Sequence, residues 1–230
     1  AASDVYKRQE KDTTFYLSVG NTRSMEYIEV NISSTTSSEV RLIKSDSPDM
    51  TPQIFLPREE DHLYSIDHDP ASSRFLIESN WKALNFRLLE TDLNNFSDKN
   101  KWKELIPHRE QVLLQSVIPF PDHLIIMERE NGLRKLKILH KESKAVKEIN
   151  FNDPTYTAYL ASNPEYYVDR FYFGYSSMRT PDSLFSVMLS SGRKRLLKEA
   201  EVKGSFSSGD YKVDREFITA RDGTQVPVSI

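Results

Sequence analysis

Short runs of strand-forming residues recur along almost the whole chain, and this repeat limits the possible folds more than any other feature. Four of the runs begin alike, at residues 15–19, 75–79, 124–128 and 171–175. A second run follows each of them about a dozen residues later, which is the spacing of a hairpin built from two five-residue strands. Since no long stretch carries a helical stripe, the pattern predicts an all-β fold.

The runs group into units that resemble one another. The second runs lie at 27–30, 86–89, 136–139 and 184–187, and a third run closes each unit at 40–43, 102–106, 146–149 and 195–197. With Phe15, Phe75, Leu124 and Phe171 taken as equivalent, the units begin 60, 49 and 47 residues apart. A repeat of about 40 to 50 residues is typical of a four-stranded β-propeller blade. The innermost strand of the blade is predicted at 63–66, 112–115 and 156–159, ahead of three of the four units.

We therefore expect a partial β-propeller of about four four-stranded antiparallel blades over residues 10–203. The chain becomes polar and glycine-containing after Leu197, and residues 204–210 are predicted to form a linker. Beyond the linker, Asp222-Gly223 lies between two strand-like runs, which is a strong hairpin signal. Residues 211–230 are thus predicted to begin a separate domain with a β-hairpin.

Both ends of the chain are interpreted as artificial. Residues 1–9 read AASDVYKRQ without an initiator Met, and we interpret them as a non-native or assembly scar that takes no part in the fold. The other end falls at Ile230, inside an alternating apolar run that carries no stop signal. The second domain is therefore expected to be truncated.

Composition narrows the function. The 31 Lys and Arg nearly balance the 34 Asp and Glu, for a formal net charge of -3, so neither nucleic acid nor an anionic membrane is expected as a partner. No apolar run is long enough to span a bilayer. The chain has no cysteine, which rules out disulfides and thiolate metal sites and fits a reducing compartment. The cytoplasm is the expected location, with the periplasm as the alternative.

The densest group of ligand-type residues surrounds one predicted strand. His62 and His68 alternate there with Asp61, Asp67 and Asp69, and imidazole with carboxylate is a set that divalent ions bind. A strand of about six residues spans nearly 20 Å, however, which separates the two histidines too widely for one metal ion. We interpret the group as a polar rim and predict no metal site and no cofactor.

Three other groups have structural interpretations. Ser176 and Ser177 lack a nearby histidine that would activate a nucleophile, so their hydroxyls are expected to bond locally in a turn. The basic residues near 195 are offset by Glu199 and Glu201 and are expected to form a solvated strand face. Those basic residues are Arg193, Lys194, Arg195 and Lys198. Trp81 and Trp102 are expected to pack in the core rather than to stack on a ligand.

Several strings resemble the oligopeptidase B group of the prolyl oligopeptidase family of serine peptidases. They include EVRL at 39–42, FLPR at 55–58, DHLYSIDH at 61–68 and ELIP at 104–107. The most specific are Tyr175-Ser176-Ser177-Met178 with Thr180-Pro181, and the segments ARDGT at 220–224 and VPVS at 226–229. Their order and separation match that family from about Asp12 to Ile230.

The resemblance implies a seven-bladed propeller that covers an α/β-hydrolase domain, whose Ser-Asp-His triad cleaves short peptides after Lys or Arg. This chain would supply about four blades and the first hairpin of the hydrolase domain. Its partners would be short peptide substrates and its own missing blades and hydrolase domain.

No catalytic residue is carried over, because the triad would lie beyond Ile230 and no position here matches it. The sequence also has no Gly-x-Ser-x-Gly, the string that a nucleophile elbow needs. The substrate-binding residues stay unknown. The alternative function is a non-enzymatic propeller that binds peptides or proteins as a scaffold.

Overall fold

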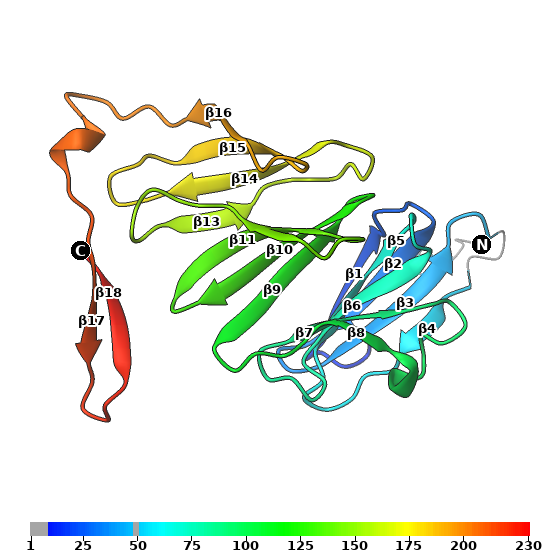
Figure 1. Ribbon diagram of the computed structural model, residues 1–230. Coiled ribbons are helices and arrows are strands. Elements are labelled where there is room, and N and C mark those ends of the chain that lie inside the picture. The colour runs from blue at the N-terminus through cyan, green and yellow to red at the C-terminus, as the bar shows by residue number, and fades with distance from the viewer. Residues whose placement is uncertain (1–8, 48–50) are drawn as a thin grey trace, which may run out of the picture. The chain divides into compact units, whose positions relative to one another are not determined.

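The computed structural model describes residues 9–47 and 51–230, in which nearly all regular structure is β-strand (Figure 1). Residues 1–8, most of the predicted scar, lie outside this described part. Four antiparallel sheets of four strands follow one another along the chain, and a two-stranded hairpin comes last. In each sheet the strands are paired in sequence order, so every sheet is built from one contiguous stretch.

The first sheet contains β1 (Tyr16–Asn21), β2 (Tyr27–Ser33), β3 (Ser38–Lys44) and β4 (Gln53–Leu56). The second contains β5 (Tyr64–Asp69), β6 (Arg74–Ser79), β7 (Arg87–Thr91) and β8 (Lys103–Ile106). The third contains β9 (Val112–Pro119), β10 (His123–Glu130), β11 (Leu133–His140) and β12 (Val146–Glu148). The fourth contains β13 (Thr157–Leu160), β14 (Arg170–Ser176), β15 (Ser183–Met188) and β16 (Lys194–Glu199). The hairpin is β17 (Arg215–Thr219) with β18 (Gln225–Ser229), and the 3₁₀ turns are η1 (Lys99–Lys101) and η2 (Ser208–Asp210).

Four four-stranded antiparallel sheets confirm the predicted blades, but the predicted phase of the first unit is wrong. The run at Phe15 belongs to β1, the first strand of its sheet, whereas Phe75 lies in β6, the second strand of the next. The first strands begin at Tyr16, Tyr64, Val112 and Thr157, so the true steps are 48, 48 and 45 residues. The predicted step of 60 residues was too long because Phe15 lies in a first strand and Phe75 in a second strand. The strand missed in the first unit is β4, which follows the run at 40–43 and does not precede Phe15.

The Asn131-Gly132 turn between β10 and β11 shows how the sequence fixes a hairpin. Asn131 has φ 49° and Gly132 has φ 80°. A two-residue turn with both residues at positive φ matches the right-handed twist of paired strands, and Asn-Gly is the dipeptide that adopts it most readily. Because the turn fixes the register, Glu130 pairs directly with Leu133.

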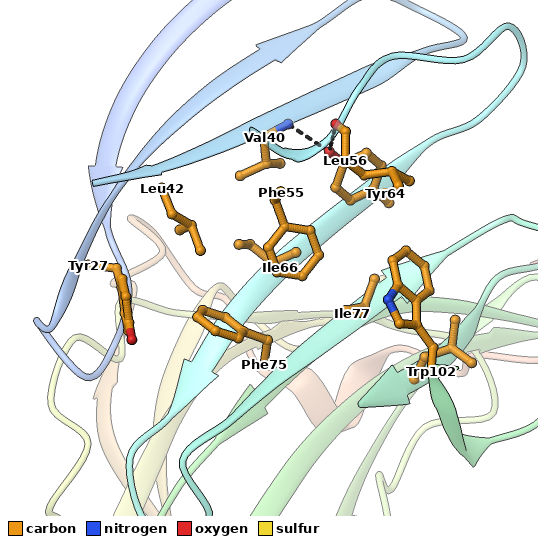
Figure 2. Close-up of a cluster of buried hydrophobic side chains, with 11 residues drawn as sticks. Tyr27, Val40, Leu42, Phe55, Leu56, Tyr64, Ile66, Phe75, Ile77 and Trp102 are labelled. Atoms are coloured by element: carbon orange, nitrogen blue, oxygen red, sulfur yellow. Dashed lines mark hydrogen bonds between the residues drawn. The ribbon is translucent and has the colours of Figure 1, made fainter. Parts of the chain in front are cut away.

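The chain divides between His108 and Arg109 into two compact units, and each unit holds two sheets. In the first unit a single core joins residues of the first sheet to residues of the second (Figure 2). Phe55 of β4 is fully buried and contacts Phe75 of β6, with ring centroids 5.5 Å apart. The buried hydroxyl of Tyr64 donates to Leu56 O at 2.6 Å and accepts from Val40 N at 2.8 Å. The two sheets therefore share apolar contacts and hydrogen bonds from the Tyr64 side chain to the backbone of the first sheet.

The second unit repeats this arrangement with the third and fourth sheets. Ile125 and Leu136 of the third sheet share a cluster with Phe171 and Phe173 of the fourth, and none of the four is more than 1% exposed. Buried alternate residues on neighbouring sheets are the pattern expected of blades stacked face to face.

The C-terminal hairpin follows the predicted Asp222-Gly223 turn. Gly223 has φ 87°, and its amide donates to Ala220 O at 3.0 Å, which closes a loop between β17 and β18. No helix in the described part of the chain has the length and apolar character needed to cross a membrane.

Candidate functional site

The structure places His62 and His68 in separate surroundings. His68, in β5, lies against the rings of Tyr27 and Phe75, with centroids 5.0 and 4.9 Å away. His62 precedes β5, and its Nε2 lies 2.9 Å from Ser79 Oγ. Within residues 9–47 and 51–230, no three His, Cys, Asp or Glu side chains gather as a metal ion would require.

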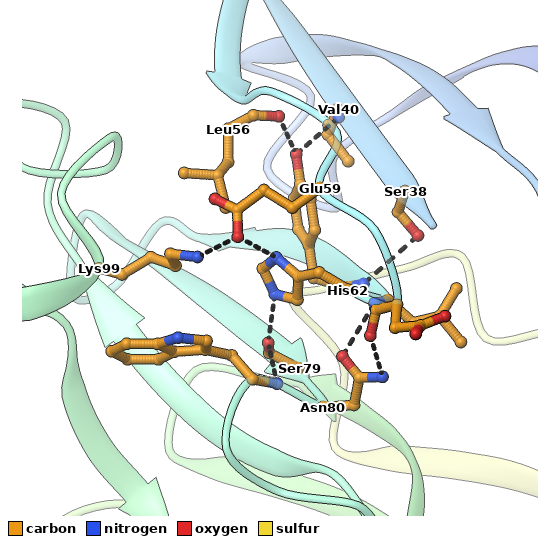
Figure 3. Close-up of polar contacts among 12 residues, drawn as sticks. Ser38, Val40, Leu56, Glu59, His62, Ser79, Asn80 and Lys99 are labelled. Carbon is orange, nitrogen blue, oxygen red and sulfur yellow. Dashed lines mark hydrogen bonds and ion pairs between the residues drawn. The ribbon is translucent and has the colours of Figure 1, made fainter. Parts of the chain in front are cut away.

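His62 lies between a serine and a carboxylate, an order that resembles a hydrolytic triad (Figure 3). Its Nδ1 lies 3.9 Å from Glu59 Oε2, too long for a hydrogen bond, and that carboxylate pairs with Lys99 Nζ at 2.6 Å. Ser79 is fully buried, and its Oγ also accepts the Trp81 amide at 3.1 Å. A hydroxyl without access to substrate cannot attack it, so this array is structural.

Burial is the main reason that the pKa of His62 is lowered, and the nearby Lys99 ammonium lowers it further. Glu59 opposes both effects. A neutral imidazole bonded to Ser79 stabilises the start of β5 against the end of β6, because the buried Nε2 of His62 would otherwise lack this partner.

A second polar group, in the second unit, centres on the buried side chain of Asp153. Its Oδ2 accepts hydrogen bonds from the Tyr175 hydroxyl at 2.8 Å and from Thr180 Oγ1 at 3.1 Å. Its Oδ1 accepts from Arg179 Nε at 2.6 Å. Burial alone would raise the pKa of Asp153, but hydrogen bonds, that of Ser177 foremost, lower it to about 2. Asp153 is therefore an ionised anchor for the loop between β14 and β15.

That loop contains the Tyr175-Ser176-Ser177-Met178 string. Ser177 Oγ accepts the amides of Arg179 and Thr180 at 3.3 and 3.0 Å, which confirms the local turn bonding expected of this residue. The loop is thus stabilised by the Ser177 hydroxyl, which bonds to the loop's own backbone, and by the carboxylate of Asp153. Sequence reasoning did not single out Asp153, because its partners follow it by more than 20 residues.

The fixed loop lines a pocket of about 490 Å³ beside the C-terminal hairpin. Hydroxyl side chains are the commonest polar groups of its wall, together with one guanidinium. The lining comprises Gly132, Leu133, Thr155, Tyr156, Thr157, Ser176, Ser177, Met178, Arg215, Pro227 and Ser229. With no histidine among these residues, the pocket has hydrogen-bond donors and acceptors for a polar chain but no base to activate a serine.

Two hydrogen bonds attach the hairpin to the third and fourth sheets, and Gly132 lies close beside it. Thr155 Oγ1 lies 2.5 Å from Ser229 Oγ, and the Arg215 guanidinium donates to Asn131 O. Gly132 lies beside the hairpin, because a Cβ built on it would be 3.4 Å from Pro227 Cγ and 3.5 Å from an Arg215 nitrogen. The hairpin therefore has a defined seat within the second unit.

The remaining sequence candidates lie outside both groups. The basic residues near 195 lie on or beside β16, all of whose residues are exposed, as expected of a solvated strand face. Trp102 is 8% exposed and belongs to the core of the first unit, as expected, whereas Trp81 is only partly buried.

Residues 2–200 match the model of one protein family, described as the N-terminal β-propeller domain of prolyl oligopeptidase. The match extends through residues 2–9, the stretch interpreted above as an assembly scar. The chain is 33% identical over 99% of its length to Protease 2 from Moraxella lacunata. It is 30% identical over its whole length to dipeptidyl aminopeptidase BI from Pseudoxanthomonas mexicana.

Solved structures agree with the sequence comparison. Oligopeptidase B from Leishmania major superposes on 96% of the chain with a TM-score of 0.86 and 26% identity. The closed form of oligopeptidase B from Trypanosoma brucei, with covalently bound antipain, gives a TM-score of 0.85 over the same share. The chain covers 32% of each of these two structures, and it spans about a third of the length of the curated relatives it matches.

Proposed function

Because the chain belongs to the prolyl oligopeptidase family, through its N-terminal β-propeller domain, we propose that it is the lid portion of a serine endopeptidase like oligopeptidase B. In the whole protein this lid covers a hydrolase domain that cleaves short peptides after Lys or Arg. The chemistry belongs to residues that this chain does not contain. One observation carries the proposal. The four sheets are followed in the chain by a separate hairpin, and this hairpin packs beside a polar pocket.

The role of the lid is steric. A ring of blades admits flexible peptides and excludes folded proteins, because entry is limited by the size of the opening. The segment 204–210 is proposed as the linker to a hydrolase domain that begins at residue 211. Two facts support this boundary: the family match ends at residue 200, and β17 begins at Arg215.

The location proposed for the whole protein is the cytoplasm. The support is the absence of cysteine, which fits a reducing compartment.

The decisive experiment compares the 230-residue chain with the product of the reading frame continued past Ile230. We expect the longer protein to hydrolyse arginyl and lysyl peptide amides and to be inactivated by a serine-directed phosphonate. The chain alone is expected to do neither. Turnover by the pure chain, or a continued frame that lacks Gly-x-Ser-x-Gly and encodes further blades, would contradict the proposal and favour a binding scaffold.

A further inference from the structure

The first unit has a pocket that is separate from the groups described above and is lined mainly by aromatic and basic side chains. It has a volume of about 350 Å³ and holds three cations and one carboxylate. Its lining comprises Trp81, Lys82, Arg87, Leu89, Lys99, Asn100, Trp102 and Glu104. These are the two tryptophans of the whole chain. Such a volume lies at the lower end of the range for small-molecule sites.

Three cations surround one indole ring. Lys82 Nζ, Arg87 Cζ and Lys99 Nζ lie 4.7, 5.1 and 5.3 Å from the ring centroid of Trp81. The face of an indole attracts a cation, but three positive charges held around one ring also repel one another. A bound anion would relieve that repulsion.

The indole that gathers the cations is held firmly. The Trp81 amide donates to the buried Ser79 hydroxyl, and its ring meets Trp102 edge-on with centroids 6.2 Å apart. Trp102 is fixed in turn, because its Nε1 donates to Phe96 O at 2.9 Å. The pocket therefore has one rigid wall, which favours binding because little order has to be created.

Lys82 occupies a backbone conformation that side-chain-bearing residues rarely adopt, with φ 52°. The turn that imposes it is closed by backbone bonds from Ala83 N to Asn80 O at 2.9 Å and from Phe86 N to Ala83 O at 2.8 Å. Backbone conformations of this kind gather at ligand-binding positions, where the surrounding structure maintains them.

The charge count leaves the pocket positive. Arg87 pairs with Glu104 at 3.1 Å and Lys99 with Glu59 at 2.6 Å, whereas Lys82 has no carboxylate partner in the part of the chain that the structure describes. In that same part, Arg87 Nε is buried without a hydrogen-bond partner. One cation without a counter-charge, beside a guanidinium whose Nε is buried and unbonded, favours a bound negative charge.

We propose that this pocket binds a small multivalent oxyanion, carboxylate or phosphate, with Lys82 as the principal charge and Arg87 and Lys99 as the flanking charges. Trp81 supplies the rigid surface that keeps the three cations together. The site does not depend on a peptidase function, since all of its residues lie in the first unit and none lines the pocket beside the hairpin.

The test uses intrinsic fluorescence, because both tryptophans of the chain line this one pocket. Inorganic phosphate and citrate are each titrated into the 230-residue chain at constant ionic strength, with chloride as the reference anion. We expect a saturable change in emission and matching shifts of the two indole N–H resonances. A response to phosphate alone identifies a phosphoryl ligand and a response to citrate alone a carboxylate ligand, and either one supports the site.

Variants separate a built site from general charge attraction. Lys82→Gln is expected to weaken binding about tenfold, as the loss of one charge-assisted contact does, and Lys82→Arg to keep most of it. The control is Lys103→Gln, which removes an exposed cation of the same sheet that pairs with Glu90 outside the pocket. No saturable response to either anion, or equal weakening by Lys82→Gln and Lys103→Gln, would overturn the proposal.

Discussion

The carboxylate of Asp153 accepts the hydroxyl of Tyr175 over 2.8 Å, which joins the segment before β13 to the end of β14. The same carboxylate holds Arg179 and Thr180, so one buried charge organises the whole loop between β14 and β15. Its removal should therefore affect the pocket as well as the stability of the second unit.

Asp153→Asn is expected to lower the free energy of unfolding of the second unit by about 2 to 3 kcal/mol, because it removes a charged acceptor from several buried donors. Urea unfolding followed by circular dichroism measures this effect. The matched control is Asp169→Asn, whose exposed carboxylate pairs with the neighbouring Arg170 and whose loss should be nearly neutral. Equal effects of the two substitutions would contradict the role given to Asp153.

Asp153 should contribute to the loss of stability of the second unit at acid pH. Its pKa is lowered from 3.8 to about 2 in the folded chain, so its stabilisation is complete above pH 4 and is lost as the pH falls toward 2. We expect the urea midpoint of the second unit to fall across that window, and to fall less in Asp153→Asn. A midpoint that varies identically in both proteins would show that other groups govern the acid limb.

Two buried carboxyls of the first unit should respond to pH in the opposite sense. Burial raises the pKa of Glu29 to about 7 and that of Asp67 to about 6, and a neighbouring carboxylate adds to each rise, Asp67 for Glu29 and Asp69 for Asp67. A raised folded-state pKa means that the contribution of these two carboxyls to stability is greatest near pH 4 and declines as the pH rises to 7. Tryptophan fluorescence reports this unit alone, and Glu29→Gln should flatten the decline between pH 5 and 7.

Gly132→Ala should loosen the C-terminal hairpin. The residue has φ 80°, where alanine is strained by about 1 kcal/mol, and a shift of this turn to relieve the strain would displace the groups that contact Pro227 and Arg215. We expect faster amide hydrogen exchange in β17 and β18. Gly20→Ala is the control, since a Cβ at Gly20 meets no atom within 4 Å and should leave the hairpin unchanged.

Ser79→Ala distinguishes a structural His62 from a hydrolytic one. The substitution leaves His62 Nε2 and the Trp81 amide without their shared partner, so the free energy of unfolding should fall by about 1 to 3 kcal/mol. Peptide hydrolysis by the longer protein should be unaffected at temperatures where the variant stays folded. Abolished turnover in a folded variant would refute the structural role.

The type and number of strands were predictable because β-branched and aromatic runs with turn residues between them identify a strand wherever it lies. The place of a strand within its sheet was not. The residues of β1 and β6 look alike, yet β1 is exposed along its whole length and β6 is mostly buried. The place of a strand in its sheet follows from how many strands precede it. Because β4 has only four residues, its run was too short to be counted as a strand.

The polar groups were less predictable for a related reason. Asp153 and Tyr175 are 22 residues apart and meet only when β13 and β14 pair. The cations around Trp81 come from a turn, a strand and a 3₁₀ turn, so their convergence depends on how those elements pack. Sequence showed the chemical types present and not which of them would become neighbours.

The contiguous construction of each sheet affects how the chain folds during synthesis. A ribosome takes roughly 2 to 10 seconds to add one 48-residue repeat, whereas a β-hairpin forms in about 1 to 10 microseconds. The four strands of a sheet can thus pair before the next sheet is translated, and no strand has to wait for a distant partner. What the first sheet of each unit lacks is a cover for its apolar face, and translation supplies that cover one repeat later as the second sheet of the same unit.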